Sequence, residues 1–345
     1  MEKYSRWRDP GTGIQPFLPP VPPRTDSSLL ATLSNVIHII VGPIQGLVKL
    51  VLVGMTALLY VLFVPLLGTL LTPLGPLKRA WNRLFSAVFL RLILFLCGFL
   101  HIKTETISVR KSRNGPSTAS GSIKSGSVIV TNSTSYIEVL YLASCNASSY
   151  NPMFVQVYTD SDKVKPITLW QAVRSTGRMP TSAPKDETLY SVKELSRLAK
   201  QKHLGPIVVF AEGTTTNGRA LLQFAPLFKD YAVTDKDGDF HIMAFKYDYG
   251  NMPPTFTVGN QFYHFFRLCS QFHNSLNVKT LAQGEAPCSG NTTVDMNNSN
   301  SSNEDPVGHL LISALGNISK LRKTGLRVTD KCDFLSYYES RQQKK

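Results

Sequence analysis

Residues Pro206 to Gly218, PIVVFAEGTTTNG, join a short apolar run to a turn that is rich in hydrogen-bonding groups. The run Ile207 to Phe210 predicts a buried strand, and the turn after it holds one carboxylate, two glycines and three threonine hydroxyls. In open α/β sheets, ligands bind at the carboxyl ends of the strands, where such turns present backbone N–H groups. The stretch therefore predicts an anion or polyol site, and an ordinary Gly/Thr turn is the alternative.

The segments around this stretch alternate between strand-like and helix-like patterns. Strands are expected at Ser127 to Thr131, Met153 to Tyr158, His241 to Tyr247 and Asn277 to Leu281. Helices are expected from about Tyr136 and at Glu187 to His203, Phe262 to Phe272 and Val307 to Lys323. This alternation predicts an α/β fold, a sheet with crossover helices.

The first hundred residues divide into a Pro-rich arm, residues 1–33, and a membrane-anchoring helix pair, residues 34–100. The run Leu50 to Leu71 has no charged residue, and its 22 residues span about 33 Å as a helix, enough for a bilayer core of roughly 30 Å. A second apolar stretch, Leu84 to Leu100, is shorter and carries Arg91. Two spans and a hairpin within one leaflet are both consistent with this pattern, and a buried soluble helix pair is the alternative.

The rest of the chain divides by composition. Residues 101–284 are expected to form the α/β domain, with a flexible Ser/Gly/Lys loop at 111–126. Residues 285–306 are an Asn/Ser-rich segment that we expect to be disordered. Residues 307–345 are expected to form C-terminal helices and a basic tail.

The net charge and the cysteine positions indicate which kinds of partner and site the protein has. The chain has 37 Lys and Arg residues against 23 Asp and Glu residues, a net charge of +14, which favours a polyanionic partner. Because long apolar segments accompany this charge, we expect a lipid membrane and no nucleic acid. The five cysteines are scattered without metal-ligand spacing, which indicates buried thiols in a reducing compartment and no metal site.

Three motifs resemble those of the glycerol-3-phosphate and lysophospholipid acyltransferase family. Residues 210–214, FAEGT, are similar to its Phe-Pro-Glu-Gly-Thr block. About 80 residues upstream, residues 132–138, NSTSYIE, stand where the family has Asn-His-x-x-x-x-Asp, with Ser133 in place of the histidine and Glu138 in place of the aspartate. Residues 175–178, STGR, lie where its Gly-and-Arg block is expected.

Two further stretches support the resemblance. Residues 271–274, QFHN, resemble a stretch of the lysophosphatidylcholine acyltransferase branch, and residues 1–20 resemble the amino terminus of a yeast member of the family. The resemblance covers most of the chain outside the two loops. It implies an acyltransferase-type mixed sheet preceded by an N-terminal membrane helix pair.

The resemblance also implies an activity, the acyl-CoA-dependent acylation of a lysophospholipid in phospholipid and triacylglycerol synthesis, with lysophosphatidic acid as the first choice. Acyl-CoA is then a co-substrate, and no cofactor is needed. The implied location is the endoplasmic reticulum membrane or a lipid droplet, with the catalytic domain facing the cytosol. Acceptor binding is implied for Asn132, Arg178, Glu212, Gly213 and Thr214.

The resemblance implies that Ser133 and Glu138 carry out catalysis. A serine hydroxyl, however, is not a proton acceptor near neutral pH. Glu138 is a direct base if its site is apolar and dry. Alternatively, Ser133 carries the acyl group, with Glu138 or a histidine such as His203 or His241 assisting. In a third interpretation nothing replaces the base, and the protein binds lipid without turning it over.

Overall fold

The structure is a computed structural model that describes residues 4–21, 29–108, 123–145, 150–232, 238–282, 284–287 and 305–343, with the backbone alone for residues 29–39. Seven strands form a mixed sheet in the order β1-β8-β7-β2-β5-β3-β4. These strands are β1 (Ile102–Ile107), β2 (Val128–Thr131), β3 (Met153–Val157), β4 (Val164–Ile167), β5 (Ile207–Phe210), β7 (Phe240–Asp248) and β8 (Ser275–Leu281). Two short strands, β6 (Ala220–Leu221) and β9 (Arg322–Lys323), pair separately.

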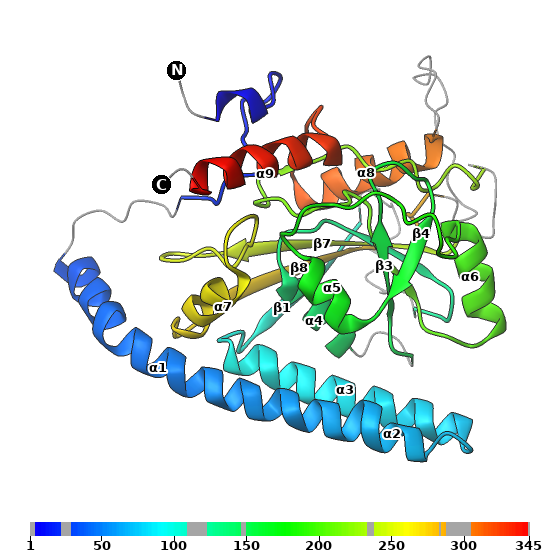
Figure 1. Ribbon diagram of the computed structural model, residues 1–345, viewed down its shortest axis with the longest axis horizontal. Helices are drawn as coiled ribbons and strands as arrows, with labels where there is room; N and C mark the ends of the chain where they lie inside the picture. The colour runs from blue at the N-terminus through cyan, green and yellow to red at the C-terminus, as the bar shows by residue number, and fades with distance from the viewer. Residues whose placement is uncertain are drawn as a thin grey trace.

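Helices cover both faces of the sheet (Figure 1). The amino-terminal ones are η1 (Ser5–Trp7), α1 (Leu29–Val61), η2 (Leu62–Leu66), α2 (Leu67–Leu70) and α3 (Gly75–Leu96). The others are α4 (Tyr136–Ser144), α5 (Leu169–Ser175), α6 (Val192–Gln201), α7 (Gln261–Cys269), α8 (Pro306–Ser319) and α9 (Val328–Gln343).

The centre of the sheet is parallel. Strand β2 lies between β5 and β7, with Thr131 opposite Phe210 on one side and Met243 on the other. Strands β2 and β5 are short apolar runs buried on both faces apart from the partly exposed Phe210, as expected for central parallel strands. Because β7–β8 and β3–β4 are antiparallel, the predicted mixed α/β sheet is confirmed.

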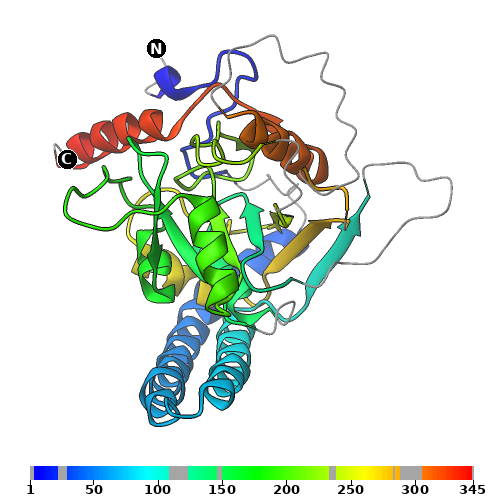
Figure 2. The same ribbon diagram turned by 90° about the vertical axis from the view of Figure 1, so that its right-hand side faces the viewer.

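Helices α1 and α3 lie side by side along one edge of the molecule, below the sheet (Figures 1 and 2). Helix α3 packs on α4 and contributes Leu90, Ile93 and Leu94 to the core on that face. Of the described helices, one passes the length and composition test for a membrane span, over Ile40–Leu70. The paired arrangement is therefore observed, whereas membrane crossing by both helices is not shown.

Several element ends differ from the sequence expectation. The helix expected from Glu187 begins at Val192, because Ser191 and Glu194 form a capping box there. The helix expected to reach Lys323 ends at Ser319, because Lys320 adopts a left-handed conformation and the chain continues as β9. Helix α9, within the segment expected to hold C-terminal helices and a basic tail, continues to Gln343.

The amino-terminal arm is ordered where it is described. Trp7 and Phe17 are buried in a small third core with Phe334 and Leu335 of α9. The aromatic residues within the Pro-rich sequence therefore anchor the arm on α9. Most of the two predicted flexible loops, residues 109–122 and 288–304, lies outside the described residues.

Candidate functional site

The loops that follow β2 and β5 meet at the carboxyl edge of the sheet. The Ser133 N–H donates to Glu212 Oε1 over 3.3 Å, and the Thr216 N–H donates to the Ser133 carbonyl over 2.9 Å. The second oxygen of Glu212 accepts the N–H of Leu222 over 3.2 Å. The two sequence blocks, about 80 residues apart, are therefore joined directly, with Glu212 as the connection.

A cavity of about 330 Å³ opens at this junction. Four of the seven predicted site residues line it, namely Ser133, Arg178, Gly213 and Thr214. The Thr214 and Thr215 hydroxyls are buried, and neither has a hydrogen-bond partner among the described residues. Unpaired buried hydroxyls on a cavity wall are available to a polar ligand, since leaving them unpaired is costly.

The second block reaches the cavity through a glycine turn after α5. Gly177 has a φ of +72°, and a Cβ atom there would lie 2.4 Å from Cε1 of Phe256, so the position favours glycine. The turn places Arg178 on the cavity wall beside Arg174, from the last turn of α5. Lys165 also lines the cavity and pairs with Glu187 over 2.5 Å. This wall is therefore cationic.

Glu138 and Glu212 lie behind the cavity wall and are fully buried. The Thr134 N–H and hydroxyl both donate to Glu138, whose carboxylate closes the first turn of α4. Burial raises the pKa of Glu138 to about 8, although the bonds from Thr134 oppose this shift. Burial also raises the pKa of Glu212 to about 8, and the nearby Glu138 adds to this shift. The expected dry site of Glu138 is therefore present, but Glu138 is not among the residues that line the cavity.

Asn132 occupies a different place from the one predicted. Its amide nitrogen donates to the Phe245 carbonyl over 3.0 Å, and its amide oxygen accepts the Phe245 N–H over 2.8 Å. The residue is fully buried and does not line the cavity. Asn132 therefore ties the end of β2 to β7, and its position does not support the predicted contact with the acceptor.

The histidines considered as assistants lie at the wrong edge of the sheet. His203 precedes β5, and His241 is paired with Ile129 near the amino end of β2. A third histidine, His264, accepts or donates a 2.8 Å hydrogen bond with Tyr136 inside the core, and burial lowers its pKa to about 4. No histidine, aspartate or glutamate is among the described residues that line the cavity.

Some site residues were not predicted from the sequence. Arg174 and Lys165 line the cavity together with the predicted residues and with Thr215, one of the three threonines of the predicted site turn. Arg174 was recognisable, because it immediately precedes the block of residues 175–178. Lys165 was not recognisable, because it comes from β4, a strand that the pattern did not predict.

The amino-terminal arm holds the end of the site loop. The Asn217 amide donates to the carbonyls of Gln15 and Leu18 over 2.7 and 2.9 Å, and the Asn217 N–H donates to the Pro16 carbonyl over 2.8 Å. These bonds fix the loop that carries Thr214 and Thr215. No pattern in the sequence indicates that the arm and this loop meet.

The buried glutamates make stability depend on pH. Both pKa values are about 8 in the folded chain against an ordinary 4.5, so the folded chain holds these two protons more tightly than the unfolded chain does. The stability that this difference contributes is complete below about pH 4.5 and is lost as the pH rises to 8. Relative to a Glu212→Gln variant, wild-type protein should lose up to about 1 kcal/mol of unfolding free energy per pH unit across this window. Urea unfolding of detergent-solubilised protein at pH 5 to 8 measures this difference. Glu339→Gln, at an exposed position, is the control, and parallel curves for wild type and Glu212→Gln would refute the assignment.

The chain was compared with known proteins. No protein-family model and no solved structure matches it. It is 29% identical over 265 residues to a Schizosaccharomyces pombe protein described as "Putative lysophosphatidic acid:oleoyl-CoA acyltransferase". The match covers 75% of the chain and 76% of that relative. This similarity agrees with the resemblance found in the sequence motifs and supports the assignment of the chain to an acyltransferase family.

Proposed function

We propose that the protein transfers an acyl group from acyl-CoA to a lysophospholipid, with lysophosphatidic acid as the preferred acceptor and phosphatidic acid as the product. The observation that carries this proposal is the cavity that joins Ser133, Arg178, Gly213 and Thr214, in a chain that also has a helix long and apolar enough to span a membrane. The name of the fission yeast relative, which includes lysophosphatidic acid and oleoyl-CoA, agrees with it.

The acceptor phosphate binds the cationic wall. Arg174 and Arg178 supply the charge, and the unpaired hydroxyls of Thr214 and Thr215 supply further donors. The cavity of about 330 Å³ has room for a glycerol phosphate head group, whereas the acyl chain extends toward the membrane. In this pose the free glycerol hydroxyl lies near Ser133.

The reaction then needs one proton transfer. The acceptor oxygen attacks the thioester carbon, the carbon–sulfur bond breaks, and the hydroxyl proton finally reaches the departing thiolate of coenzyme A. Glu138 takes this proton in transit, because a pKa of about 8 suits a general base near neutral pH. The proton reaches Glu138 through the hydroxyl of Thr134, which donates to Glu138, whereas Ser133 contributes only one hydrogen bond to the acceptor.

The helix pair holds this site at a membrane, lying within one leaflet. Helix α1 packs lengthwise on the domain: Lys49, within the helix, donates to the Gln271 carbonyl, and Tyr60, near its carboxyl end, packs edge-on against Trp170. A crossing perpendicular to the bilayer would draw the charged α5 and α7 into hydrocarbon, which is costly. An in-plane hairpin with the α/β domain in the cytosol, on the endoplasmic reticulum or a lipid droplet, avoids this cost.

A paired arginine variant tests acceptor recognition. Arg174→Ala/Arg178→Ala should raise the KM for lysophosphatidic acid about a hundredfold or more, because each of the two lost charge-assisted hydrogen bonds contributes about 1.5–3 kcal/mol. The same variant should use monoacylglycerol, which lacks the phosphate, as well as wild-type protein does. Assays with labelled oleoyl-CoA measure both rates, and Arg197→Ala on the exposed face of α6 is the control. Equal losses with both acceptors would contradict phosphate binding at this wall.

A non-catalytic lipid-binding protein of the same fold is the second candidate. It is favoured by one observation, that no described cavity-lining residue is a histidine or a carboxylate. A panel of lysophospholipids offered with labelled oleoyl-CoA separates the two functions. Binding of a lysophospholipid without product formation would establish the second.

A further inference from the structure

A second, larger cavity lies beside the candidate site. It has a volume of about 910 Å³ and is enclosed by the segment after β3, residues 158–162, by residues 223–226, and by α8 and the start of α9. Gly213 forms part of the partition between the two cavities, because a Cβ atom there would lie 3.3 Å from Val157 and 3.4 Å from Val328. Val157 lines the first cavity and Val328 the second. The two cavities are therefore about one residue apart.

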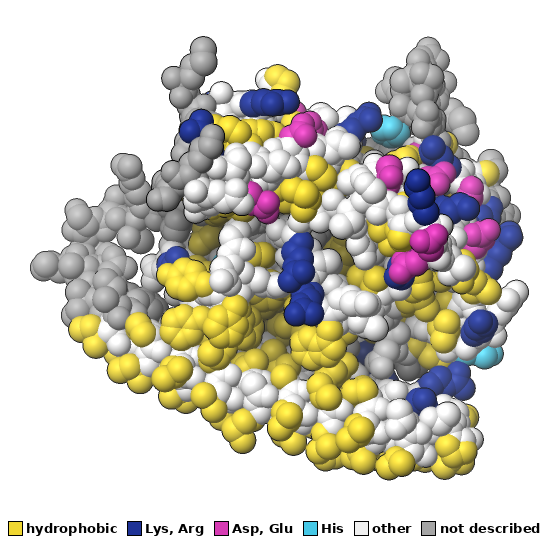
Figure 3. All heavy atoms as spheres, in the orientation of Figure 1, with side chains coloured by type: hydrophobic (Ala, Val, Ile, Leu, Met, Phe, Trp, Pro, Cys, Tyr) yellow, Lys and Arg dark blue, Asp and Glu magenta, His cyan; other side chains and the backbone are white. Residues whose placement is uncertain are grey.

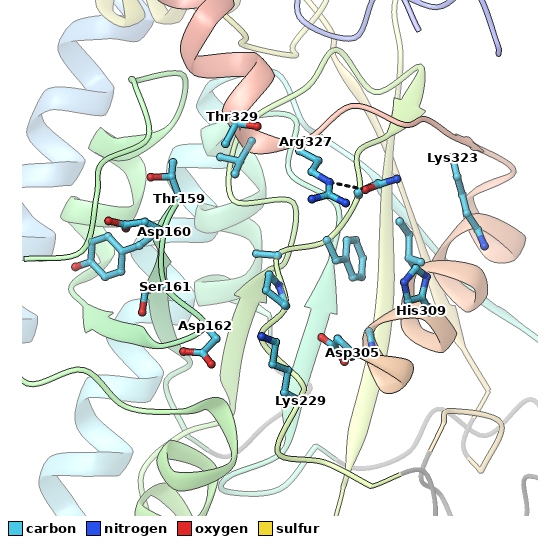
Figure 4. A pocket seen from close by; sticks show the side chains of 18 of the residues that line it. Thr159, Asp160, Ser161, Asp162, Lys229, Asp305, His309, Lys323, Arg327 and Thr329 are labelled. Atoms are coloured by element: carbon cyan, nitrogen blue, oxygen red, sulfur yellow. Dashed lines mark hydrogen bonds between the residues drawn. The ribbon is translucent and has the colours of Figure 1, made fainter. Parts of the chain in front are cut away.

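The second cavity has walls of opposite charge (Figure 4). Arg327, Lys323 and His309 stand on the side of α8 and α9, whereas Asp160 and Asp162 stand on the wall that follows β3. Lys229 and Asp305 lie near its lower end, and the Asp305 carboxylate accepts the N–H groups of Gly308 and Phe228. Asp160 similarly accepts the N–H of Ala183. Two of the three carboxylates thus already bind backbone donors.

The cationic side chains keep donors for a ligand. Arg327 uses its Nε–H for the Gln223 side chain over 2.8 Å, and Lys323 donates to the Ser313 hydroxyl over 2.6 Å. A guanidinium carries five N–H donors and an ammonium three, so phosphate oxygens can still be bound. The opposite wall, with Asp160 and Asp162, can accept hydrogen bonds from the amino group of a nucleobase or from ribose hydroxyls. This combination fits a nucleoside phosphate.

The location agrees with such a ligand. The helix pair, with its apolar surface, lies below the sheet, whereas α8 and α9 lie above it (Figures 1 and 3). A thioester bound at the first cavity has an apolar tail that belongs at the membrane and a polyanionic head that belongs in water. The second cavity is on the side away from the membrane, next to the reacting group.

We infer that the second cavity binds the nucleoside phosphate end of acyl-CoA, with its phosphates on Arg327 and Lys323 and its adenosine donors toward Asp160 and Asp162. This inference rests on the proposed function for the identity of the donor substrate. The nucleoside phosphate half of acyl-CoA, which the small first cavity cannot hold, then has a separate site.

The test compares an Arg327→Ala/Lys323→Ala variant with wild-type protein. Both residues are exposed at the surface, so the fold should tolerate their loss. We expect the KM for oleoyl-CoA to rise about tenfold or more, and the KM for oleoyl-pantetheine, which lacks the nucleotide, to stay unchanged. Calorimetry with adenosine 3′,5′-bisphosphate should show a matching loss of affinity. Arg322→Ala, at an exposed neighbour that does not line the cavity, is the control and should behave as wild type.

The outcomes separate the two proposals. In one outcome wild-type protein transfers no acyl group but binds the bisphosphate, and the double variant does not bind it. This result would support the nucleoside phosphate site and refute the proposed function. In the other outcome wild-type protein transfers the acyl group, but it does not bind the bisphosphate or the double variant binds it equally well. This result would overturn the cavity inference alone. An equal rise in KM for oleoyl-CoA and oleoyl-pantetheine would overturn it too.

Discussion

A variant with glutamate in place of Leu47, Leu58 and Leu66 should be lost from membranes. These three side chains are 59%, 71% and 60% exposed on the outer face of α1 and η2, where apolar residues gather along the lower edge of the molecule (Figure 3). Burying one leucine contributes about 1.5–3 kcal/mol, so losing three should lower membrane partitioning by roughly a thousandfold or more. Vesicle flotation of the purified protein measures this change.

The control for this variant is Val21→Glu, on the arm at the opposite side, where the side chain is 74% exposed. It should float with the vesicles as wild type does. Deleting residues 1–100 would be a poorer test, because it removes the buried Leu90, Leu94 and Phe99 from the core. A folded triple variant that still floats with vesicles would show that the anchor lies elsewhere.

The second large effect is expected at Glu138. Replacing it with glutamine should lower the rate of acyl transfer about a hundredfold or more, because the proton acceptor is lost. The glutamine amide oxygen can still accept the Thr134 N–H, so the first turn of α4 should survive. Ser133→Ala should cost about tenfold or less, the scale of one hydrogen bond. Steady-state rates with oleoyl-CoA and lysophosphatidic acid measure both.

The relative size of these two losses separates the mechanisms. If Ser133 carries the acyl group, Ser133→Ala should be as damaging as Glu138→Gln, and rapid quenching should trap an acyl-protein adduct. Circular dichroism and lysophospholipid binding serve as controls for folding. A well-folded Glu138→Gln protein with wild-type turnover would exclude Glu138 as the base.

The central fold was predictable because its strands are short apolar runs. Strands β2 and β5 are buried on both faces except at Phe210, and their patterns stand out from the flanking turns. Strand β1, IKTETI, was missed because it lies at an edge, with exposed residues along its centre. Helix α9 was anticipated only as unspecified C-terminal helices, because its polar sequence has a weak apolar face and its aromatic residues pack against the distant arm.

The site was predictable as a meeting of two blocks but not in its detail. Adjacent parallel strands bring their carboxyl ends together, so Ser133 and Glu212 had to be neighbours. The inward turn of Glu138 depends on the backbone of Thr134, and the amide pairing of Asn132 depends on the register of β7. Residue types and spacing do not fix either contact. The same holds for the arm, because its bonds to Asn217 join residues about 200 positions apart.

The proposed activity of this protein is acyl transfer from acyl-CoA to lysophosphatidic acid. Its most direct test is the rate of labelled phosphatidic acid formation by purified wild-type protein in lipid vesicles, given labelled oleoyl-CoA and lysophosphatidic acid. We predict product at a rate that depends on enzyme concentration and that Glu138→Gln lowers about a hundredfold. Binding of both substrates by a folded, vesicle-bound protein without formation of phosphatidic acid would contradict the claim.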